Sequence, residues 1–253
     1  MLLITTLEST ESTNIYLQKL VSQKKENSKN VSPTDIPEFY TVRTNFQTNG
    51  KGQKENCWVS EPEKNILLST IIYPKIKAED QFIINIMITL GILDFCKRTL
   101  NSNDLTIKWP NDIYYKDSKL GGVLIEHSIM GNSINYSILG IGLNINQLNF
   151  PKTLSNPVSI SQITKQDYNI DQCVRDLLTD ISNRYFKIET NIQQLKKEYL
   201  HSLYRYKELH SYSINNTKIK ATINNVNKYG MLCLTTSDSE KLECNFKEIS
   251  YII

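Results

Sequence analysis

The 253-residue sequence predicts an α+β fold, in which a mixed β-sheet carries packed helices and is followed by a small β-rich piece. Segments with the apolar spacing of helices alternate with strand-like runs up to about residue 207. This mixture favours a layered domain of sheet and helices over an all-helical or all-β one. From about residue 212 only short β-type runs remain, separated by turn residues. We therefore expect two units, residues 1–208 and 209–253.

The N-terminal part of the chain predicts a helix that begins near Thr13. Ser12 and Asn14 flank that position with groups that cap helix N-termini, and apolar residues follow at Ile15 and Leu17. Beyond this helix the apolar patterns predict a strand over 39–43, a strand over 65–73, a buried helix over 79–100, and successive strands over 104–109, 112–115, 119–129 and 134–145.

Three further segments complete the predicted order. Residues 46–57, FQTNGKGQKENC, contain two glycines and hardly any apolar anchor, so we expect an exposed and mobile loop. Residues 146–170 are rich in Asn, Pro, Ser and Thr and predict a connection, after which residues 171–207 carry the apolar spacing of two helices. Residues 212–253 show the short runs and turns that are typical of a small barrel.

Composition and charge exclude several classes of function. The formal net charge of +3 comes from 29 basic and 26 acidic side chains, so no basic surface for nucleic acid is expected. No apolar run approaches the roughly 20 residues that span a bilayer, and the N-terminus lacks the pattern of a secretory signal. The five cysteines show no C-x-x-C spacing. We expect a soluble cytoplasmic protein with reduced thiols, with neither nucleic acid nor membrane as partner, and with no metal held by its own side chains.

The strongest chemical signal is the segment KWPND, from Lys108 to Asp112, followed by Lys119 and the glycine pair at 121–122. Trp-Pro-Asn-Asp is compatible with a plain turn between strands, because Pro fixes one dihedral angle and Asn and Asp favour turns. A turn alone leaves Lys119 unexplained. A lysine that leads into paired glycines can direct its ammonium into a cleft where the backbone approaches a ligand closely. Such a charge suits a transferring phosphoryl group.

These motifs closely resemble the catalytic domain of the bacterial biotin protein ligases, whose hallmarks are the K-W-P-N-D segment and the K-[LI]-[AG]-G strand after it. Three further family elements occur in the same order: Ser-Thr-Asn at 12–14, a glycine-containing loop at 47–58, and GIGLNIN at 140–146. The resemblance covers essentially the whole chain. It implies a class II synthetase-like catalytic domain followed by an SH3-like barrel, in a short form without an N-terminal DNA-binding domain.

The resemblance also implies the reaction. Biotin and ATP would form biotinyl-5′-AMP with release of pyrophosphate, and biotin would then pass to the amine of a specific lysine on a biotin carboxyl carrier protein. Mg²⁺ is expected to accompany ATP. Relatives of this kind often form homodimers through the central sheet, which is an expectation for this chain as well.

The family motifs assign the expected site residues by position. Lys119, Asp112 and Lys51 are the expected catalytic residues: the lysines offset negative charge, and Asp112 orients or deprotonates the acceptor amine. Biotin is expected to contact Ser12, Thr13, Asn14, Gln47, Gly50, Lys51, Gly52, Gln53, Lys119, Gly140 and Gly142, of which the last two would leave room for it. The nucleotide is expected to contact Trp58, Asn111, Asp112 and Asn144.

The 47–58 loop departs from the family pattern Q-T-x-G-R-G-x-x-x-x-x-W and its common variants. Lys51 replaces the first arginine, Gln53 occupies a second position where arginine is frequent, and Glu55 occupies a position where glycine is frequent. Lysine keeps the charge but lacks the planar fork of arginine, so a looser hold on phosphate is expected. These departures keep open the possibility of a biotin-binding protein with weakened catalysis.

The same resemblance leaves two alternative functions to be compared with a biotin protein ligase. A lipoate or octanoate protein ligase would share the fold and the adenylate chemistry, but the intact KWPND segment with the Gly-Lys-Gly loop resembles the biotin branch. A biotin-responsive transcription regulator would need a helix-turn-helix domain before Ser12, where no such domain fits, so repression is not expected. Residues 209–253 are expected to aid catalysis without holding the reacting groups, with Lys247 and Glu248 as candidate contributors.

Overall fold

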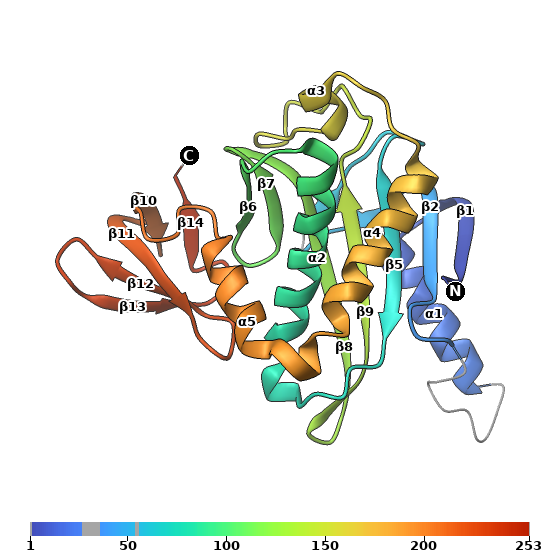
Figure 1. Cartoon of the computed structure of the whole chain (residues 1–253), viewed down its shortest axis with the longest axis horizontal. Helices are drawn as coiled ribbons and strands as arrows, with labels where there is room; N and C mark the ends of the chain where they lie inside the picture. The colour runs from blue at the N-terminus through green and yellow to red at the C-terminus, as the bar shows by residue number, and fades with distance from the viewer. Residues whose placement is uncertain (1, 27–35, 54–55, 253) are drawn as a thin grey trace.

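Two β-sheets organise the chain in the computed structural model, which describes residues 2–26, 36–53 and 56–252 (Figure 1). The larger sheet has seven strands in the order β1 (Ile4–Thr10), β2 (Thr41–Gln47), β5 (Ile66–Ile72), β9 (Ser133–Leu143), β8 (Ser118–Met130), β7 (Asp112–Tyr115) and β6 (Leu105–Lys108). The β1 and β2 strands are parallel, and every other neighbouring pair in this sheet is antiparallel. The predicted mixed sheet is therefore confirmed.

Helices cover both faces of the seven-stranded sheet. On one face, α1 (Thr13–Glu26) packs through Leu17 and Val21 onto Val42, Ile71 and Ile138. On the other face lie α2 (Phe82–Leu100), α4 (Ile170–Tyr185) and α5 (Ile188–His201), as Figure 1 shows. Every residue of β5 is buried because it is sandwiched between these two layers. The strand thereby presents alternate side chains to two separate cores.

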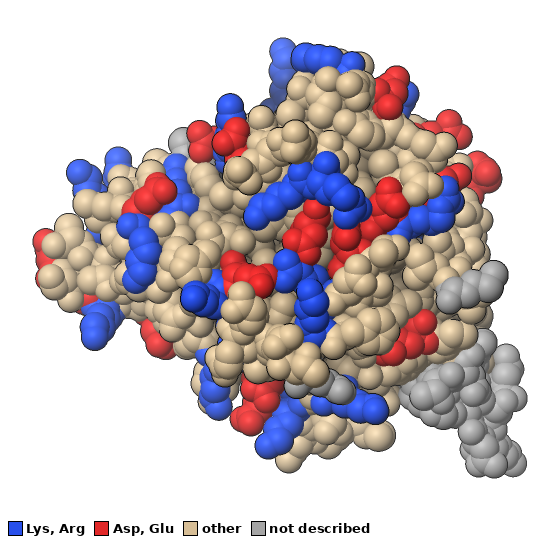
Figure 2. All heavy atoms as spheres, viewed as in Figure 1, with Lys and Arg blue, Asp and Glu red and all other residues tan. Residues whose placement is uncertain are grey.

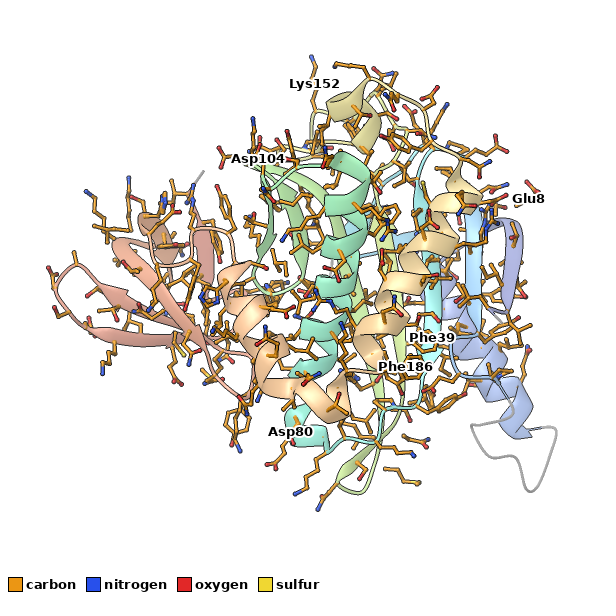
Figure 3. The ribbon with its side chains drawn as sticks, viewed as in Figure 1. Glu8, Phe39, Asp80, Asp104, Lys152 and Phe186 are labelled. Carbon is orange, nitrogen blue, oxygen red and sulfur yellow. The ribbon has the colours of Figure 1, made fainter. Side chains whose placement is uncertain are left out.

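The apolar helix α2 is the centre of the larger core. It is buried along most of its length, and Gly91 lies so close to Ile181 of α4 that a side chain at Gly91 would overlap it. The predicted helix over 79–100 is confirmed, although its first turn is a separate 3₁₀ turn over Ala78–Asp80. At the far end of α4, Phe186 packs against Phe39 just before β2, as the labels in Figure 3 show.

The edge strand β1 and the helix α3 were absent from the sequence-based expectations. The side chains of β1, at the sheet edge, do not alternate clearly between buried and exposed positions, because most of them remain partly exposed. The short helix α3 (Ile160–Thr164) lies within the predicted connection and begins with a capping box between Ser159 and Gln162. The predicted strand over 39–43 is also shifted, because Phe39 has a positive φ of 62° and β2 begins only at Thr41.

The five-stranded sheet contains β10 (Leu209–Ile214), β11 (Thr217–Val226), β12 (Leu232–Thr236), β13 (Lys241–Cys244) and β14 (Ile249–Tyr251). Its order is β13-β12-β11-β10-β14, with antiparallel pairing throughout. This sheet fits an SH3-like domain. Within the described residues no pairing joins β13 to β14, so the structure shows an antiparallel sheet without closure into a barrel. The chain enters this sheet at Leu209.

The segment over 46–57 is more ordered than a plain loop. Gly50–Lys51 (β3) pairs antiparallel with Cys57–Trp58 (β4) to form a short hairpin, while Phe46 and Gln47 belong to β2. The predicted exposed loop therefore has strand structure at its two ends, because backbone pairing supplies order that apolar anchors do not.

The surface carries mixed charge. Lysine and arginine side chains alternate with aspartate and glutamate over the face in Figure 2, in line with the small net charge. Among the helices of the described residues, none is both long and apolar enough to cross a membrane.

Candidate active site

A cavity of about 590 Å³ lies where the start of α1, the β3–β4 hairpin, the β7 to β9 strands and the end of the five-stranded sheet meet. Most of the residues that the motifs predict converge on its wall. Those residues are Ser12, Thr13, Asn14, Gln47, Lys51, Gly52, Gln53, Trp58, Asn111, Asp112, Lys119, Gly140 and Gly142. They come from four separate stretches of sequence, which the fold brings together.

Lys119 and Asp112 form an ion pair inside this cavity. The Nζ atom of Lys119 lies 2.7 Å from Oδ1 of Asp112, and both side chains are about one-third exposed or less. The register between β7 and β8 shifts between Ile113 and Tyr114. A bulge of this kind places one extra residue in β8 and so turns Lys119 to the same face as Gly122. A side chain at Gly122 would contact both members of the pair, so this glycine leaves the room that the pair occupies.

The cavity wall is rich in positive charge. Four lysines line it, Lys51, Lys108, Lys119 and Lys247, and Asp112 is the one acidic residue among the described residues of the wall. Lys108 donates to the hydroxyl of Tyr114 at 3.0 Å. Burial lowers the pKa of Lys108, while the charge of Asp112 opposes that shift. Such a wall suits an anionic ligand, because fixed cations in a partly desolvated site stabilise negative charge.

The KWPND turn is anchored from outside the motif. The carbonyl oxygen of Pro110 accepts hydrogen bonds from the Asn85 amide at 2.7 Å and from the Tyr199 hydroxyl at 2.8 Å. The side-chain amide of Asn111 donates to the carbonyl of Val123, and the amide of Val123 donates back to Asn111 at 3.2 Å. These bonds fix the position of Asp112 relative to β8.

A chain of polar side chains forms the floor of the cavity, which Thr13, Asn14 and Gln47 line directly and which Ser69 and Glu126 support through hydrogen bonds. The Gln47 side-chain oxygen accepts from the backbone amide of Thr13 at 2.9 Å and lies 3.2 Å from the Thr13 hydroxyl. The Thr13 hydroxyl lies 2.7 Å from that of Ser69, and the Ser69 hydroxyl contacts Asn14 Oδ1. The amide nitrogen of Asn14 donates to Glu126 at 2.7 Å. Sequence reasoning missed Ser69 and Glu126, although Ser69 is a polar residue in the otherwise apolar first half of β5.

The two glycines of β9 lie close to protein side chains. A side chain at Gly140 would overlap the amide of Asn14, and one at Gly142 would overlap the indole of Trp58. In this structure Asn14 and Trp58 occupy the space that the two glycines leave, and both glycines also line the cavity, so their predicted contact with biotin stays a prediction. Trp58 also lies with its ring centroid 6.0 Å from Lys119 Nζ.

Two predicted residues lie off the cavity wall. Gly50 is buried in the hairpin, where a side chain would overlap the backbone of Trp58. The side-chain amide of Asn144 donates to Val158 at 3.0 Å, so it secures the chain before α3. Gln53 does line the cavity, and its buried side-chain oxygen accepts no hydrogen bond within the described residues. Glu55 lies outside the described residues.

The five-stranded sheet closes one side of the cavity. Its contributions are Phe246, Lys247, Ile249, Ser250 and Tyr251. Of these the sequence suggested only Lys247, because short strands without a polar motif give no signal for the others. Glu248, the other suggested residue, does not line the cavity; its carboxylate accepts from the Asn245 backbone amide at 2.7 Å and holds the preceding turn.

The described histidines have local partners away from this site. His127 contacts the Ser137 hydroxyl at 2.8 Å, and burial lowers the pKa of its imidazole. His201 contacts the Lys197 carbonyl, and His210 contacts Glu208. In residues 2–26, 36–53 and 56–252 no three His, Cys, Asp or Glu side chains gather in the way a protein-held metal requires.

Comparison with known proteins gives a consistent result. The family model of the biotin/lipoate A/B protein ligase family matches residues 7–144. The chain is 25% identical over 175 residues to the bifunctional ligase/repressor BirA of Bacillus spizizenii, covering 68% of this chain and 54% of that protein. It is 28% identical over 160 residues to the biotin–protein ligase of Homo sapiens, covering 61% of this chain and 19% of that protein. The chain thus spans about half or less of these relatives.

Solved structures share the whole fold. The biotin protein ligase of Aquifex aeolicus, solved with biotin and ATP, superposes with a TM-score of 0.74 at 21% identity and covers 98% of this chain and 97% of its own. The biotin protein ligase of Leishmania major, solved with biotinyl-5-AMP, gives a TM-score of 0.63 at 21% identity, with 96% and 98% covered. The arrangement of both sheets is therefore one that such proteins adopt.

Proposed function

The chain belongs to the biotin/lipoate A/B protein ligase family, and from this premise we propose that it is an ATP-dependent biotin protein ligase. The observation that carries the proposal is the convergence of the four motif stretches on one lysine-lined cavity that holds the Lys119–Asp112 pair. The proposed reaction forms biotinyl-5′-AMP and then biotinylates a lysine of a biotin carboxyl carrier protein.

In the first step a carboxylate oxygen of biotin attacks the α-phosphorus of ATP. The bond between that phosphorus and the oxygen bridging to the β-phosphate breaks, and pyrophosphate leaves. Both reactants are anions, so their approach requires positive charge. Lys119 and Lys51 line the cavity and supply it, and Lys108 and Lys247 extend it along the same wall. Preorganised charges of this kind commonly contribute the largest part of the rate enhancement.

In the second step the acceptor amine attacks the carbonyl carbon of the adenylate. The bond from that carbon to the phosphate oxygen breaks, AMP leaves, and the attacking nitrogen loses a proton. Asp112 is the only carboxylate among the described residues of the cavity wall, so we assign it to orient the amine and accept that proton. The ion pair with Lys119 holds its carboxylate in place.

The proposal includes Mg²⁺ as the companion of ATP. With a single carboxylate and four lysines on the described wall, the cavity offers few oxygen ligands for a cation of its own. Mg²⁺ would therefore be held through the phosphate oxygens, with Asp112 as the nearest protein carboxylate, and would supply charge neutralisation when bound. The protein residues bind, orient and exclude water from the reacting groups.

The roles of the remaining residues follow from their places. We propose that Ser12, Thr13, Asn14 and Gln47 bind the head group of biotin, and that Trp58 and Asn111 lie at the nucleotide. Residues 1–208 form the catalytic unit and residues 209–253 a second unit that closes the cavity. A carboxylase carrier subunit is the proposed partner. The proposed compartment is the cytoplasm, in line with the five unpaired cysteines, all of which lie within the described residues.

A homodimer through the seven-stranded sheet is part of the proposal. Within the described residues β1 pairs only with β2, so its other edge is available to a second copy. Sedimentation velocity at several concentrations, with and without biotin and ATP, would measure it. A single monomer boundary under all conditions would remove the dimer from the proposal.

One experiment tests the central proposal. The protein is incubated with ATP, Mg²⁺, biotin and a biotin carboxyl carrier domain, and the intact mass of the carrier is measured. We expect one added biotinyl group, and none when ATP is omitted. Parallel reactions with lipoate and octanoate test the other branch of the family; acylation of a lipoyl carrier domain without biotinylation would overturn the assignment.

A further inference from the structure

The hydrogen-bond polarity of the cavity floor is set by two groups that cannot reverse their roles. A backbone amide always donates, so the Thr13 amide, 2.9 Å from Gln47, fixes the oxygen of that side chain toward Thr13. An ionised carboxylate only accepts, so Glu126, 2.7 Å from Asn14, fixes the amide nitrogen of Asn14 toward itself. The Asn14 oxygen must then face Ser69. Both ends of the chain are acceptors.

Between these fixed acceptors the floor has too few protons. It runs from the Gln47 oxygen through the Thr13 and Ser69 hydroxyls to the Asn14 oxygen, which makes three oxygen-to-oxygen contacts. The two hydroxyls supply two protons for them. When Thr13 donates to Gln47, the single hydroxyl proton of Ser69 can go to Thr13 or to the Asn14 oxygen, but not to both. A ligand N–H donated to the Asn14 oxygen leaves the Ser69 proton for Thr13. A ligand that donates there completes the chain.

The sheet register holds Asn14 in this position. Ser69 of β5, Gly140 of β9 and Leu124 of β8 lie side by side in one row across three strands. The Asn14 amide lies over this row, directly above Gly140, and its nitrogen also lies 3.5 Å from the Leu124 carbonyl. Asn14 is only 2% exposed and Ser69 is fully buried, so water does not readily supply the missing proton. Asn14 and Gly140 both line the cavity.

We propose that Glu126 is a positioning residue, which turns the Asn14 oxygen into a fixed acceptor and thereby makes the cavity favour a ligand with an N–H donor in its buried head group. This inference rests on the proposed function. The ureido ring of biotin carries such donors, whereas the dithiolane ring of lipoate and the chain of octanoate carry none. Glu126 therefore contributes to the choice between the two substrate classes of the family without contacting the reacting atoms.

The test variant is Glu126→Leu, which removes the acceptor and frees the Asn14 amide to rotate. We expect the KM for biotin in ATP–pyrophosphate exchange to rise about tenfold or more, because a buried polar group then loses its partner. At saturating biotin kcat should stay near that of the wild type, the KM for ATP should change less than twofold, and the binding of octanoate in calorimetry should not weaken. Glu126→Gln keeps an acceptor oxygen and should restore most of the biotin affinity. Glu240→Leu, at an exposed position in the turn between β12 and β13, is the matched control.

The outcomes separate this inference from the proposed function. If the wild type shows no biotin-dependent exchange, the proposed function fails, and this inference fails with it. If the wild type is active and Glu126→Leu keeps the wild-type KM for biotin, only the inference is overturned. An equal rise in the KM values for biotin and ATP, or a loss that Glu126→Gln does not restore, would assign Glu126 to the general fold and overturn it as well. Melting temperatures of all variants identify any loss that arises from unfolding.

Discussion

Lys119 Nζ lies 2.7 Å from Asp112 Oδ1 inside the cavity, directly over Gly122. The two residues face each other across neighbouring strands because a bulge in β8 turns Lys119 onto the same face as Gly122. An incoming phosphate or carboxylate competes with Asp112 for the ammonium. The protein thus holds this charge in position before the substrate arrives, so little reorganisation is needed when the reaction begins.

Lys119→Ala should lower the rate of biotin-dependent pyrophosphate exchange by about 10²-fold or more, because one preorganised charge is lost at the developing negative centre. The fold should persist, since the side chain is one-third exposed. Lys116→Ala, at an exposed lysine on the neighbouring turn, is the control and should exchange as the wild type does. Near wild-type exchange in Lys119→Ala would show that this lysine is not at the reacting centre.

Lys51→Arg should retain the adenylate longer. Lys51 is an exposed residue on the hairpin that lines the cavity, and the planar guanidinium offers two parallel hydrogen bonds to a phosphate where the ammonium offers a point charge. Release of labelled biotinyl-5′-AMP from a preformed complex should be slower than in the wild type. Lys64→Arg, outside the cavity, should release it at the wild-type rate. Faster release from Lys51→Arg would contradict the phosphate role.

The β3–β4 hairpin should be protected by ligand. Among the described residues its two strand pairings, Gly50 to Trp58 and Lys51 to Cys57, are extended by one backbone hydrogen bond from Gly52 to Asn56, so this short hairpin should open readily in the free protein. Limited trypsin cleavage after Lys51 should slow when biotin and ATP are added together. Cleavage after the exposed Lys152, which does not line the cavity and is labelled in Figure 3, should not change. Equal rates at Lys51 with and without ligand would exclude a hairpin that closes over the substrate.

Lys108→Met should stabilise the protein at neutral pH while weakening ATP binding. Burial lowers the pKa of Lys108 in the folded state, so the cost of holding it charged is present in full below that folded-state pKa. The cost disappears as the pH rises toward the ordinary lysine pKa. Urea denaturation should therefore show the variant to be more stable than the wild type at pH 7, by a margin that shrinks at alkaline pH. Lys116→Met should show no such pH-dependent margin.

Gly230→Ala should destabilise the contact between the two sheets. Gly230 has a φ of 85°, and a side chain there would overlap the ring of Phe82 on α2. Its carbonyl also accepts from the Trp109 indole at 3.0 Å. Gly131→Ala is a matched control, since it has a φ of 59° with open space around it. The control should cost about 1 kcal/mol of unfolding free energy and Gly230→Ala about 1–3 kcal/mol more. Equal costs would mean that Phe82 moves away freely.

Truncation after Lys207 would remove part of the core on which the catalytic unit rests. Tyr212, Ile223 and Leu234 of the five-stranded sheet belong to the same core cluster as α2. Removing them exposes apolar surface of the catalytic unit. Point variants at the contact, such as Gly230→Ala, therefore probe the role of the second sheet more cleanly than deletion does.

The sequence by itself determined the order of elements and the chemistry of the motif residues. The apolar spacing of the sequence predicts helices α1, α2, α4 and α5. A helix that buries one face repeats apolar residues at the helical period, and a helix that is buried all round is apolar on every face. The KWPND segment, Lys119 and residues 12–14 were identified because their residue types and order are local properties of the chain. Thirteen of the residues identified in this way line one cavity: Ser12, Thr13, Asn14, Gln47, Lys51, Gly52, Gln53, Trp58, Asn111, Asp112, Lys119, Gly140 and Gly142.

Tertiary structure alone decided which groups meet. Glu126 and Asn14 are 112 residues apart, and Ser69 reaches Asn14 only because β5, β9 and β8 are neighbours in the sheet. The Trp58 indole occupies the space that a side chain at Gly142 would fill. Tyr251 of the five-stranded sheet lines the cavity. Contacts of this kind depend on strand order and register, which local patterns do not encode. The hydrogen-bond polarity of the floor therefore emerges only when distant residues are packed together.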